Sequence, residues 1–188
     1  MNTIQQMARF LYSELEFAPQ LLLFKGGNKP NAIARECEAV LAVPDADATK
    51  ARFEAFGKDV KGEFAVSDPD VTFTAAVCFL NEKAVDPVTA RNLITSLFTC
   101  PHGVQAMSQE IKGLVETSTN LASIRMTEHG VIKVVTSQRS SINSAKKMIA
   151  AKVRACFEAA GAEVEHQYEY PGWKPDTQSH ILHECVES

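Results

Sequence analysis

Arg139 stands out in the sequence because of the residues around it. The stretch VIKVVTSQRSSINSAKKMIA, residues 131–150, alternates like a strand and then changes to helical spacing, and Arg139 lies at the change among three serines. A guanidinium can grip a carboxylate or a phosphate with two parallel hydrogen bonds. The start of the following helix would favour an anion at the same place, because its free amides carry partial positive charge. The pattern is typical of an anion clamp, but a strand-end salt bridge to Glu116 or Glu128 would use the same residue.

Two asparagines lie in a turn-rich stretch near the start of the chain. The string GGNKPNAIARE, residues 26–36, places Asn28 and Asn31 where glycine and proline make the backbone turn. Asparagine often only supports such a turn through its own side chain. Loops also carry binding residues, so the alternative is a side-chain amide presented to a ligand. The residues alone leave both interpretations open.

The last residues contain a group with metal-binding chemistry. In HILHEC, residues 180–185, two histidines lie one helical turn apart beside Glu184 and Cys185, a set that could hold a soft divalent metal. The order differs from the helical motif that joins two zinc ligands to a glutamate base, and the alternative is an exposed terminal segment. His102, in the turn CPHGV, is expected to be an ordinary polar residue, and the local patterns of nucleophiles and phosphate-binding loops are missing. We therefore predict neither a catalytic residue nor a metal ligand in this chain.

Composition excludes several classes of function. The chain has 188 residues, of which 45% are hydrophobic and 22% charged, as expected of one globular domain with a real core. With 19 Lys and Arg against 23 Asp and Glu, the net charge of -4 gives no reason to expect nucleic acid as a partner. No apolar run approaches the roughly 20 residues that span a membrane, and the first residues do not resemble a secretory signal. Five scattered cysteines without a CxxC pair indicate reduced thiols in a cytoplasmic protein.

The elements that must position these side chains follow from apolar spacing. Helical periodicity predicts helices at 2–17, 46–61, 86–99 and 143–160, the third opened by an Asp-Pro pair. Alternating or continuous apolar runs predict strands at 20–24, 37–43, 71–79, 113–125, 131–139 and 162–170. Their order favours an α+β fold, a mostly antiparallel sheet with helices packed on one face. The βαβ portions indicate a ferredoxin-like arrangement with additions.

Four strings, in order along the chain, carry a resemblance to a known family. They are GGNKPNAIARE, PHGVQAMSQEIKGLVETSTNLASI, VVTSQRSSINSAKKMI and EYPGWKPDTQSHIL. In these strings, and over essentially its whole length, the chain resembles the aminoacyl-histidine dipeptidases, also called peptidase D or cytosol non-specific dipeptidases. These enzymes are dinuclear zinc exopeptidases related to carnosinase. The strings VETSTNLA and YPGWKPD are the most specific.

The resemblance implies a particular part of such an enzyme. Full-length members carry a zinc-binding catalytic domain interrupted by a lid, or dimerisation, domain, and residues 1–177 resemble that inserted domain alone. Residues 178–188 would lead back to the missing catalytic domain, which holds both zinc ions. We therefore expect a hydrolase fragment that is inactive by itself, forms a homodimer, pairs with its own catalytic domain and closes over a dipeptide such as Xaa-His.

The resemblance also implies roles for two residues. In the family, an arginine at the end of the matching strand grips the C-terminal carboxylate of the substrate, and Arg139 stands at that position. An asparagine of the first string faces the cleft, and Asn31 matches it. Two other functions stay open. One is a non-catalytic dimerisation or interaction module, and the other is a small anion-binding regulatory domain, which rests only on Arg139 and fold analogy.

Overall fold

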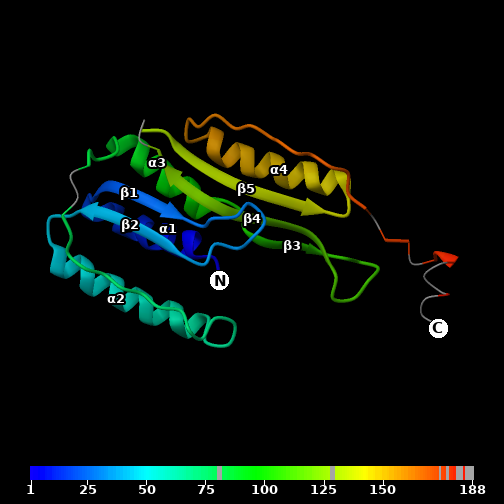
Figure 1. Ribbon diagram of the computed structural model, residues 1–188, viewed down its shortest axis with the longest axis horizontal. Helices are drawn as coiled ribbons and strands as arrows, with labels where there is room; N and C mark the ends of the chain where they lie inside the picture. The colour runs from blue at the N-terminus through cyan, green and yellow to red at the C-terminus, as the bar shows by residue number, and fades with distance from the viewer. Residues whose placement is uncertain (80–81, 128–129, 174, 177, 181–183, 185–188) are drawn as a thin grey trace.

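A five-stranded antiparallel sheet forms the centre of the described chain (Figure 1). The computed structural model describes residues 1–188 except 80–81, 128–129, 174, 177, 181–183 and 185–188. The strands are β1 (Gln20–Gly26), β2 (Cys37–Ala42), β3 (Gly103–Met107), β4 (Val115–Met126) and β5 (Ile132–Ser140). Every pairing between them is antiparallel, as the sequence predicted.

The long strand β4 organises the sheet. Along one edge it pairs with β5 over most of its length, which makes the predicted hairpin. Along its other edge it pairs first with β3 and then, at Ile124, with Gly26 of β1. Strand β2 continues the sheet beyond β1. Residues of three strands therefore meet across the first half of β4.

Helices cover one face of the sheet and leave the other face open. The covering helices are α1 (Thr3–Glu14), α3 (Pro87–Thr99) and α4 (Asn143–Glu158), and Figure 1 looks onto the open face with α1 and α3 behind the strands. Alternate residues of β4 are buried on the covered side, among them Thr117, Thr119 and Leu121. This arrangement confirms the predicted α+β fold. None of the helices in the described part of the chain is long and apolar enough to cross a lipid bilayer.

Side-chain caps fix where two helices begin. Asn2 accepts a hydrogen bond from the backbone amide of Gln5 at 3.1 Å, and Asp86 accepts one from that of Thr89 at 2.9 Å. Such caps satisfy amides that have no partner within the helix. The second cap belongs to the predicted Asp-Pro pair. Asn2 also donates to the carbonyl of Leu121 at 2.7 Å, so its buried side chain ties the start of α1 to β4.

The core lies between the covered face of the sheet and these helices. Burial of apolar side chains there is the main favourable term in folding. None of its central side chains is more than 3% exposed; they are Phe24, Leu121 and Ile124 of the sheet, Ile4 and Leu11 of α1, Ile94 and Leu97 of α3, and Val153 of α4.

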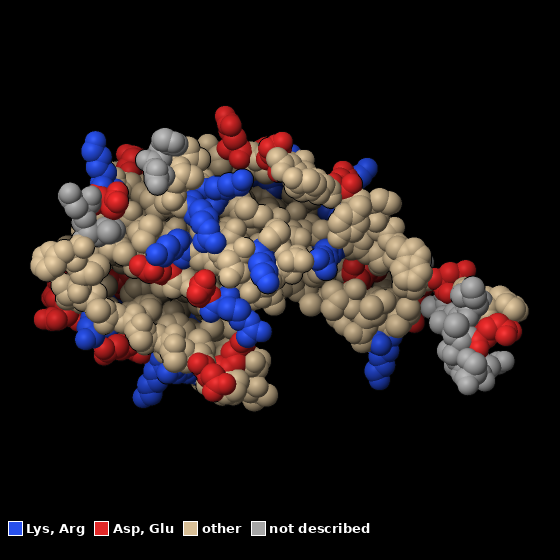
Figure 2. Space-filling view, in the orientation of Figure 1, with Lys and Arg blue, Asp and Glu red and all other residues tan. Residues whose placement is uncertain are grey.

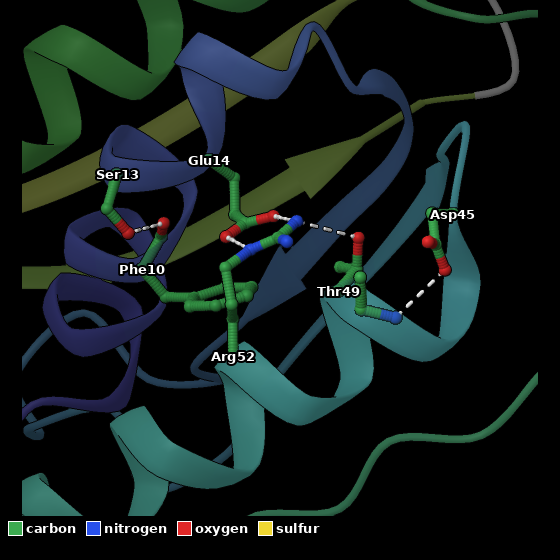
Figure 3. A network of polar contacts seen from close by, with 7 residues as sticks. Phe10, Ser13, Glu14, Asp45, Thr49 and Arg52 are labelled. Atoms are coloured by element: carbon green, nitrogen blue, oxygen red, sulfur yellow. Dashed lines mark hydrogen bonds and ion pairs between the residues drawn. The ribbon is translucent and has the colours of Figure 1, made fainter.

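The remaining helix, α2 (Ala46–Glu63), packs on α1. Arg52 of α2 reaches the buried carboxylate of Glu14 with two hydrogen bonds of 2.7 Å each (Figure 3). The same guanidinium lies 3.9 Å from the centroid of the Phe17 ring. The rings of Phe10 and Phe53 meet edge to face, with centroids 4.9 Å apart. Aromatic packing and one enclosed ion pair therefore join α2 to the rest of the domain.

Two predicted strands do not form. Residues 71–79 and 162–170 are fully described and pair with no strand, so both predictions were wrong. In the first segment, the ring of Phe73 packs edge to face on that of Phe56 in α2, whereas Val77 and Phe79 are exposed. The second segment follows α4 (Figure 1), and Val164 packs against the core from it. The short strand β3 was not predicted.

Candidate functional site

A cavity of about 320 Å³ opens on the helix-free face of the sheet. Both residues that the sequence singled out, Arg139 and Asn31, line it, whereas Asn28 does not. The other lining residues come from the loop after β1 and from β3, β4 and β5; they are Ile33, His102, Gly103, Val104, Val115, Ser118, Thr119, Asn120 and Ser137. The fold thus brings the two predicted residues to one place.

Strand register places three lining residues in one row. Ser118 lies opposite Val104 of β3 on one side and opposite Arg139 of β5 on the other. Directly paired residues share a face of the sheet, so this row crosses three strands on the open side. Asn120 and Ser137 form a second pair of the hairpin on the same face. The floor of the cavity therefore carries hydroxyl and amide groups between an arginine and a valine.

Arg139 is exposed, and within the described part of the chain it makes no ion pair. Its expected alternative partner Glu116 instead accepts a hydrogen bond from the hydroxyl of Thr117 at 3.4 Å. The other expected partner, Glu128, lies outside the described residues. Among the residues that the structure describes, no Asp or Glu lines the cavity. A guanidinium presented in this way can take a carboxylate through two parallel hydrogen bonds.

The loop that carries Asn31 is held against β4. Asn120 donates through Nδ2 to the carbonyl of Ala32 at 2.7 Å. Gly27 begins the loop with a φ of 64°, in the left-handed region that favours glycine. A side chain at Gly27 would overlap the carbonyl of Ala122 in β4. The close contact of Gly27 with β4 and the hydrogen bond that Asn120 donates to the loop therefore position the exposed Asn31 at the cavity.

His102 was expected to be an ordinary turn residue, and it belongs instead to the cavity wall. Its Nδ1 accepts a hydrogen bond from the backbone amide of Leu121 at 3.2 Å. Burial lowers the pKa of His102 below its ordinary value, so the ring is neutral at neutral pH. A neutral ring that accepts at Nδ1 carries its proton on Nε2. His102 therefore adds an uncharged donor to the wall.

Only one of the three serines around Arg139 lines the cavity. That residue is Ser137, whereas Ser140 hydrogen bonds to the hydroxyl of Thr117 at 2.9 Å on the covered face, and Ser141 is not in the lining. Helix α4, which is described throughout, adds no residue to the lining either. The predicted convergence of serines and helix amides on Arg139 is therefore not found. Strand alternation explains Ser140, because it turns the immediate neighbours of Arg139 to the opposite face, and Ser141 lies beyond the end of β5.

The lining as a whole can bind an anion that accepts several hydrogen bonds. Donors are available from the guanidinium, the Asn31 amide, the His102 ring and two serine hydroxyls. Basic side chains also gather more widely on the open face, as Figure 2 shows over the strands. Within that face, exposed Arg125 and Lys133 lie directly opposite each other on β4 and β5. A negatively charged ligand suits this face better than a positively charged one.

Comparison with known proteins gives a clear relationship. No family model matches the chain. The chain is 30% identical over 185 residues to the cytosol non-specific dipeptidase of Escherichia coli strain K12, covering 97% of this chain and 38% of that protein. It superposes with a TM-score of 0.90 and 33% identity on the crystal structure of the aminoacylhistidine dipeptidase from Vibrio alginolyticus, again over 97% of this chain and 38% of that one. The chain is a homologue of one part of these dipeptidases.

The predicted resemblance to the aminoacyl-histidine dipeptidases is therefore confirmed. Both relatives are peptidases by name, and the chain spans about two fifths of their length. The strings VETSTNLA and PHGV, which carried the resemblance, also contain cavity residues that the sequence reasoning missed. Ser118 and Asn120 are alternate residues of β4, which pairs with the strand that carries Arg139. Their spacing in the predicted hairpin could have placed them on the same face as Arg139. His102 could be placed only once β3, which it precedes, was known.

The zinc site that the resemblance implies was expected in a domain outside this chain. Among the described residues, no three His, Cys, Asp and Glu side chains gather in a way that could hold a metal ion. In the HILHEC segment, His180 Nε2 and Glu184 Oε1 are 3.6 Å apart on exposed side chains. His183 and Cys185 lie outside the described residues, so the metal-binding interpretation of this segment stays untested.

A second and larger hollow, of about 630 Å³, lies between α3 and α4. Arg91 and Lys152 are the charged residues of its lining, which includes none of the residues predicted to bind a ligand. Its walls come from the helix layer, whereas Arg139 lies on the open face of the sheet. The smaller cavity is therefore the candidate site of this dipeptidase homologue.

Proposed function

We propose that this chain is the lid domain of a metal-dependent dipeptidase and that its cavity binds the C-terminal carboxylate of the substrate. The observation that carries the proposal is the meeting of Arg139 and Asn31 in one cavity that no described acidic residue lines. An exopeptidase must recognise a free terminus, and a planar guanidinium does so with two parallel hydrogen bonds. Holding the carboxylate would orient the scissile bond for groups elsewhere in a longer protein.

The proposal divides the work between this chain and residues outside it. Arg139 binds the carboxylate, Asn31 and His102 offer uncharged donors beside it, and closure of the domain excludes water from the bound dipeptide. The two zinc ions that the resemblance implies would be held by a catalytic domain outside this sequence, and the chain by itself would be inactive.

Location and assembly belong to the same proposal. The name of the Escherichia coli relative, a cytosol dipeptidase, supports a cytoplasmic protein. Burial raises the pKa of Cys37 and of Cys100 to about 12, so both thiols stay protonated and unreactive at neutral pH. A homodimer is proposed from the resemblance, and sedimentation of the chain would measure it. A dimer without any carboxylate binding would favour the alternative, a non-catalytic interaction module.

An activity assay of the isolated chain tests the division of work. The chain is supplied with zinc and a Xaa-His dipeptide, and release of the free amino acids is followed. We expect no turnover, because the catalytic groups are assigned to residues outside this sequence. Zinc-dependent hydrolysis by the pure chain would refute that assignment.

Substitution of Arg139 in the full-length protein tests the binding role. Arg139→Ala is expected to raise KM and to lower kcat/KM. The lost transition-state stabilisation should be about 2–4 kcal/mol, as for loss of an enclosed charge-assisted contact. The matched control is Arg125→Ala, which removes an exposed arginine from the paired strand outside the cavity lining. An unchanged kcat/KM in Arg139→Ala would remove this residue from the substrate site.

A further inference from the structure

We propose that His102 and Ser137 form a subsite that selects a substrate whose C-terminal residue carries a planar, uncharged side chain with one hydrogen-bond acceptor and one donor. This inference rests on the proposed function, since it takes the substrate carboxylate to be held by Arg139. It adds two residues that discriminate between substrates, and it names the chemistry that they recognise.

A second row of polar side chains lies beside Arg139 in the cavity. Its members are His102, Asn120 and Ser137, and all three line the cavity. Asn120 pairs with Ser137 of β5 on one side, and on its other side lies His102, whose ring accepts from the amide of the next residue, Leu121. Since Ser137 comes two residues before Arg139 on β5, the Cα atoms of these two residues are about 7 Å apart.

Only the two ends of this row are free to bind a ligand. The middle residue, Asn120, donates to the carbonyl of Ala32 at 2.7 Å and accepts from the side chain of Asn2 at 3.5 Å. In the part of the chain that the structure describes, neither Nε2 of His102 nor the hydroxyl of Ser137 has a hydrogen-bond partner. The neutral ring of His102 offers a proton at Nε2, whereas a hydroxyl can accept as well as donate.

The width between the two ends fits one small planar group. His102 and Ser137 flank Asn120 on opposite sides, and neighbouring strands are about 4.8 Å apart, so the Cα atoms of His102 and Ser137 are about 10 Å apart. A hydrogen bond of about 2.9 Å at each end leaves room for a group with polar atoms on two edges. His102 donates to the acceptor of that group, and the oxygen of Ser137 accepts from its donor.

The C-terminal residue is the part of a dipeptide that can reach this row. In the proposed function, the N-terminal residue and the scissile bond must reach catalytic groups outside this chain. The C-terminal residue, with its carboxylate on Arg139, then stays over the cavity. The separation of about 7 Å between Arg139 and Ser137 is comparable with the reach of a histidine side chain from its own carboxylate.

Hydrogen bonding and charge narrow the class of side chain. An apolar side chain would leave the polar groups of His102 and Ser137 without partners once water is excluded, which weakens binding. A Lys or Arg side chain has no acceptor, and no described Asp or Glu lines the cavity to balance its charge. An acidic side chain would compete with the terminal carboxylate for Arg139. Imidazole and carboxamide groups match the pattern, and the imidazole ring loses less rotamer freedom on binding.

Titration of the 188-residue chain with N-acetyl amino acids tests the inference. The probes are N-acetyl-L-histidine and N-acetyl-L-phenylalanine at about pH 8, where the imidazole of the first probe is uncharged. Binding is followed through the backbone amide signals of Gly103, Ser118 and Arg139. We expect the histidine probe to bind about tenfold more tightly than the phenylalanine probe, the scale of one or two neutral hydrogen bonds.

Variants separate the subsite from the carboxylate site. Ser137→Ala removes one hydroxyl from β5, and His102→Asn keeps an acceptor for the Leu121 amide on a shorter side chain. Each should bring the histidine-to-phenylalanine ratio closer to one, and Ser137→Ala decides the matter if His102→Asn fails to fold. The control Ser123→Ala removes a half-buried hydroxyl of β4 outside the cavity lining and should leave the ratio unchanged. Arg139→Gln should abolish binding of both probes.

The outcomes that overturn the two proposals differ. Equal binding of the two probes, or tighter binding of the phenylalanine probe, with both lost in Arg139→Gln, overturns the subsite and retains the carboxylate site. A ratio that is unchanged in either folded variant, Ser137→Ala or His102→Asn, overturns the subsite as well, because both ends must contact the bound side chain. Binding that persists in Arg139→Gln, or the absence of any response of the cavity signals to the two probes, overturns the proposed function and the inference with it.

Discussion

The Nδ1 atom of His102 accepts a hydrogen bond from the backbone amide of Leu121, 3.2 Å away. Leu121 is fully buried in β4, so this bond fixes the residue before β3 against the neighbouring strand. Acceptance at Nδ1 requires that this nitrogen carry no proton, and burial, which lowers the pKa of the ring, favours the same neutral form. Protonation of His102 would therefore oppose the native contact.

We expect His102 to make the folded chain less stable in mild acid. Its pKa is lower in the folded than in the unfolded chain, so the unfolded state binds more protons once the pH falls below about 6.5. The contribution of His102 to the free energy of unfolding is thus fully present above that pH and is lost as pH falls towards the folded pKa. The thermal midpoint Tm should be lower at pH 5 than at pH 7.5.

His102→Asn is the matched variant for that prediction. The Asn side-chain oxygen can accept from the Leu121 amide but does not titrate. The two proteins differ only at residue 102, so the difference between their pH profiles belongs to His102. We expect a smaller fall of Tm between pH 7.5 and pH 5 in the variant. Identical falls would show that His102 does not couple protonation to folding.

Gly27 is predicted to be essential for the loop that carries Asn31. Gly27→Ala combines a left-handed φ with overlap between the new side chain and the carbonyl of Ala122. Gly113→Ala is the control, because Gly113 has a φ of 84° and open space around it. The control should cost about 1–2 kcal/mol of the free energy of unfolding through backbone strain alone. Gly27→Ala should cost at least about twice as much, measured by urea denaturation; equal losses would contradict the close contact.

Much of the fold followed from sequence because local and tertiary preferences agree in its strongest elements. The hairpin of β4 and β5 alternates in sequence, and the structure buries one side of it, as that pattern predicts. Segment 71–79 alternates equally well, yet Phe73 packs on α2 and the backbone pairs with no strand. Alternation in this segment therefore marks a contact of Phe73 with a helix, and it does not mark burial at Val77 and Phe79, which are exposed.

The cavity was less predictable than the elements that form it. Arg139 and Asn31 could be singled out by type and context, but their meeting depends on register between strands. That register includes a shift between Leu121 and Ser123, which the sequence does not announce. Since β3 was not predicted, the row that joins Val104 to Arg139 could not be drawn before the structure was known.

We expect loss of Arg52 to destabilise the folded chain strongly, because its ion-pair partner Glu14 is buried. The side chain of Glu14 is 2% exposed and that of Arg52 33%, and two hydrogen bonds of 2.7 Å join them (Figure 3). Arg9 and Glu63 also connect α1 to α2 with bonds of 2.7 and 2.8 Å, but their side chains are 41% and 43% exposed. The two pairs share their geometry and differ in burial, which makes the second a control for the first.

Arg52→Met should therefore lower Tm more than Arg9→Met does. The first variant leaves the carboxylate of Glu14 buried without a cation, whereas Glu63 stays exposed to water in the second. The double variant Glu14→Gln with Arg52→Met should recover part of the loss, because no charge then stays buried. Equal deficits for the two single variants would mean that burial of Glu14 does not govern the stability of the α1–α2 contact.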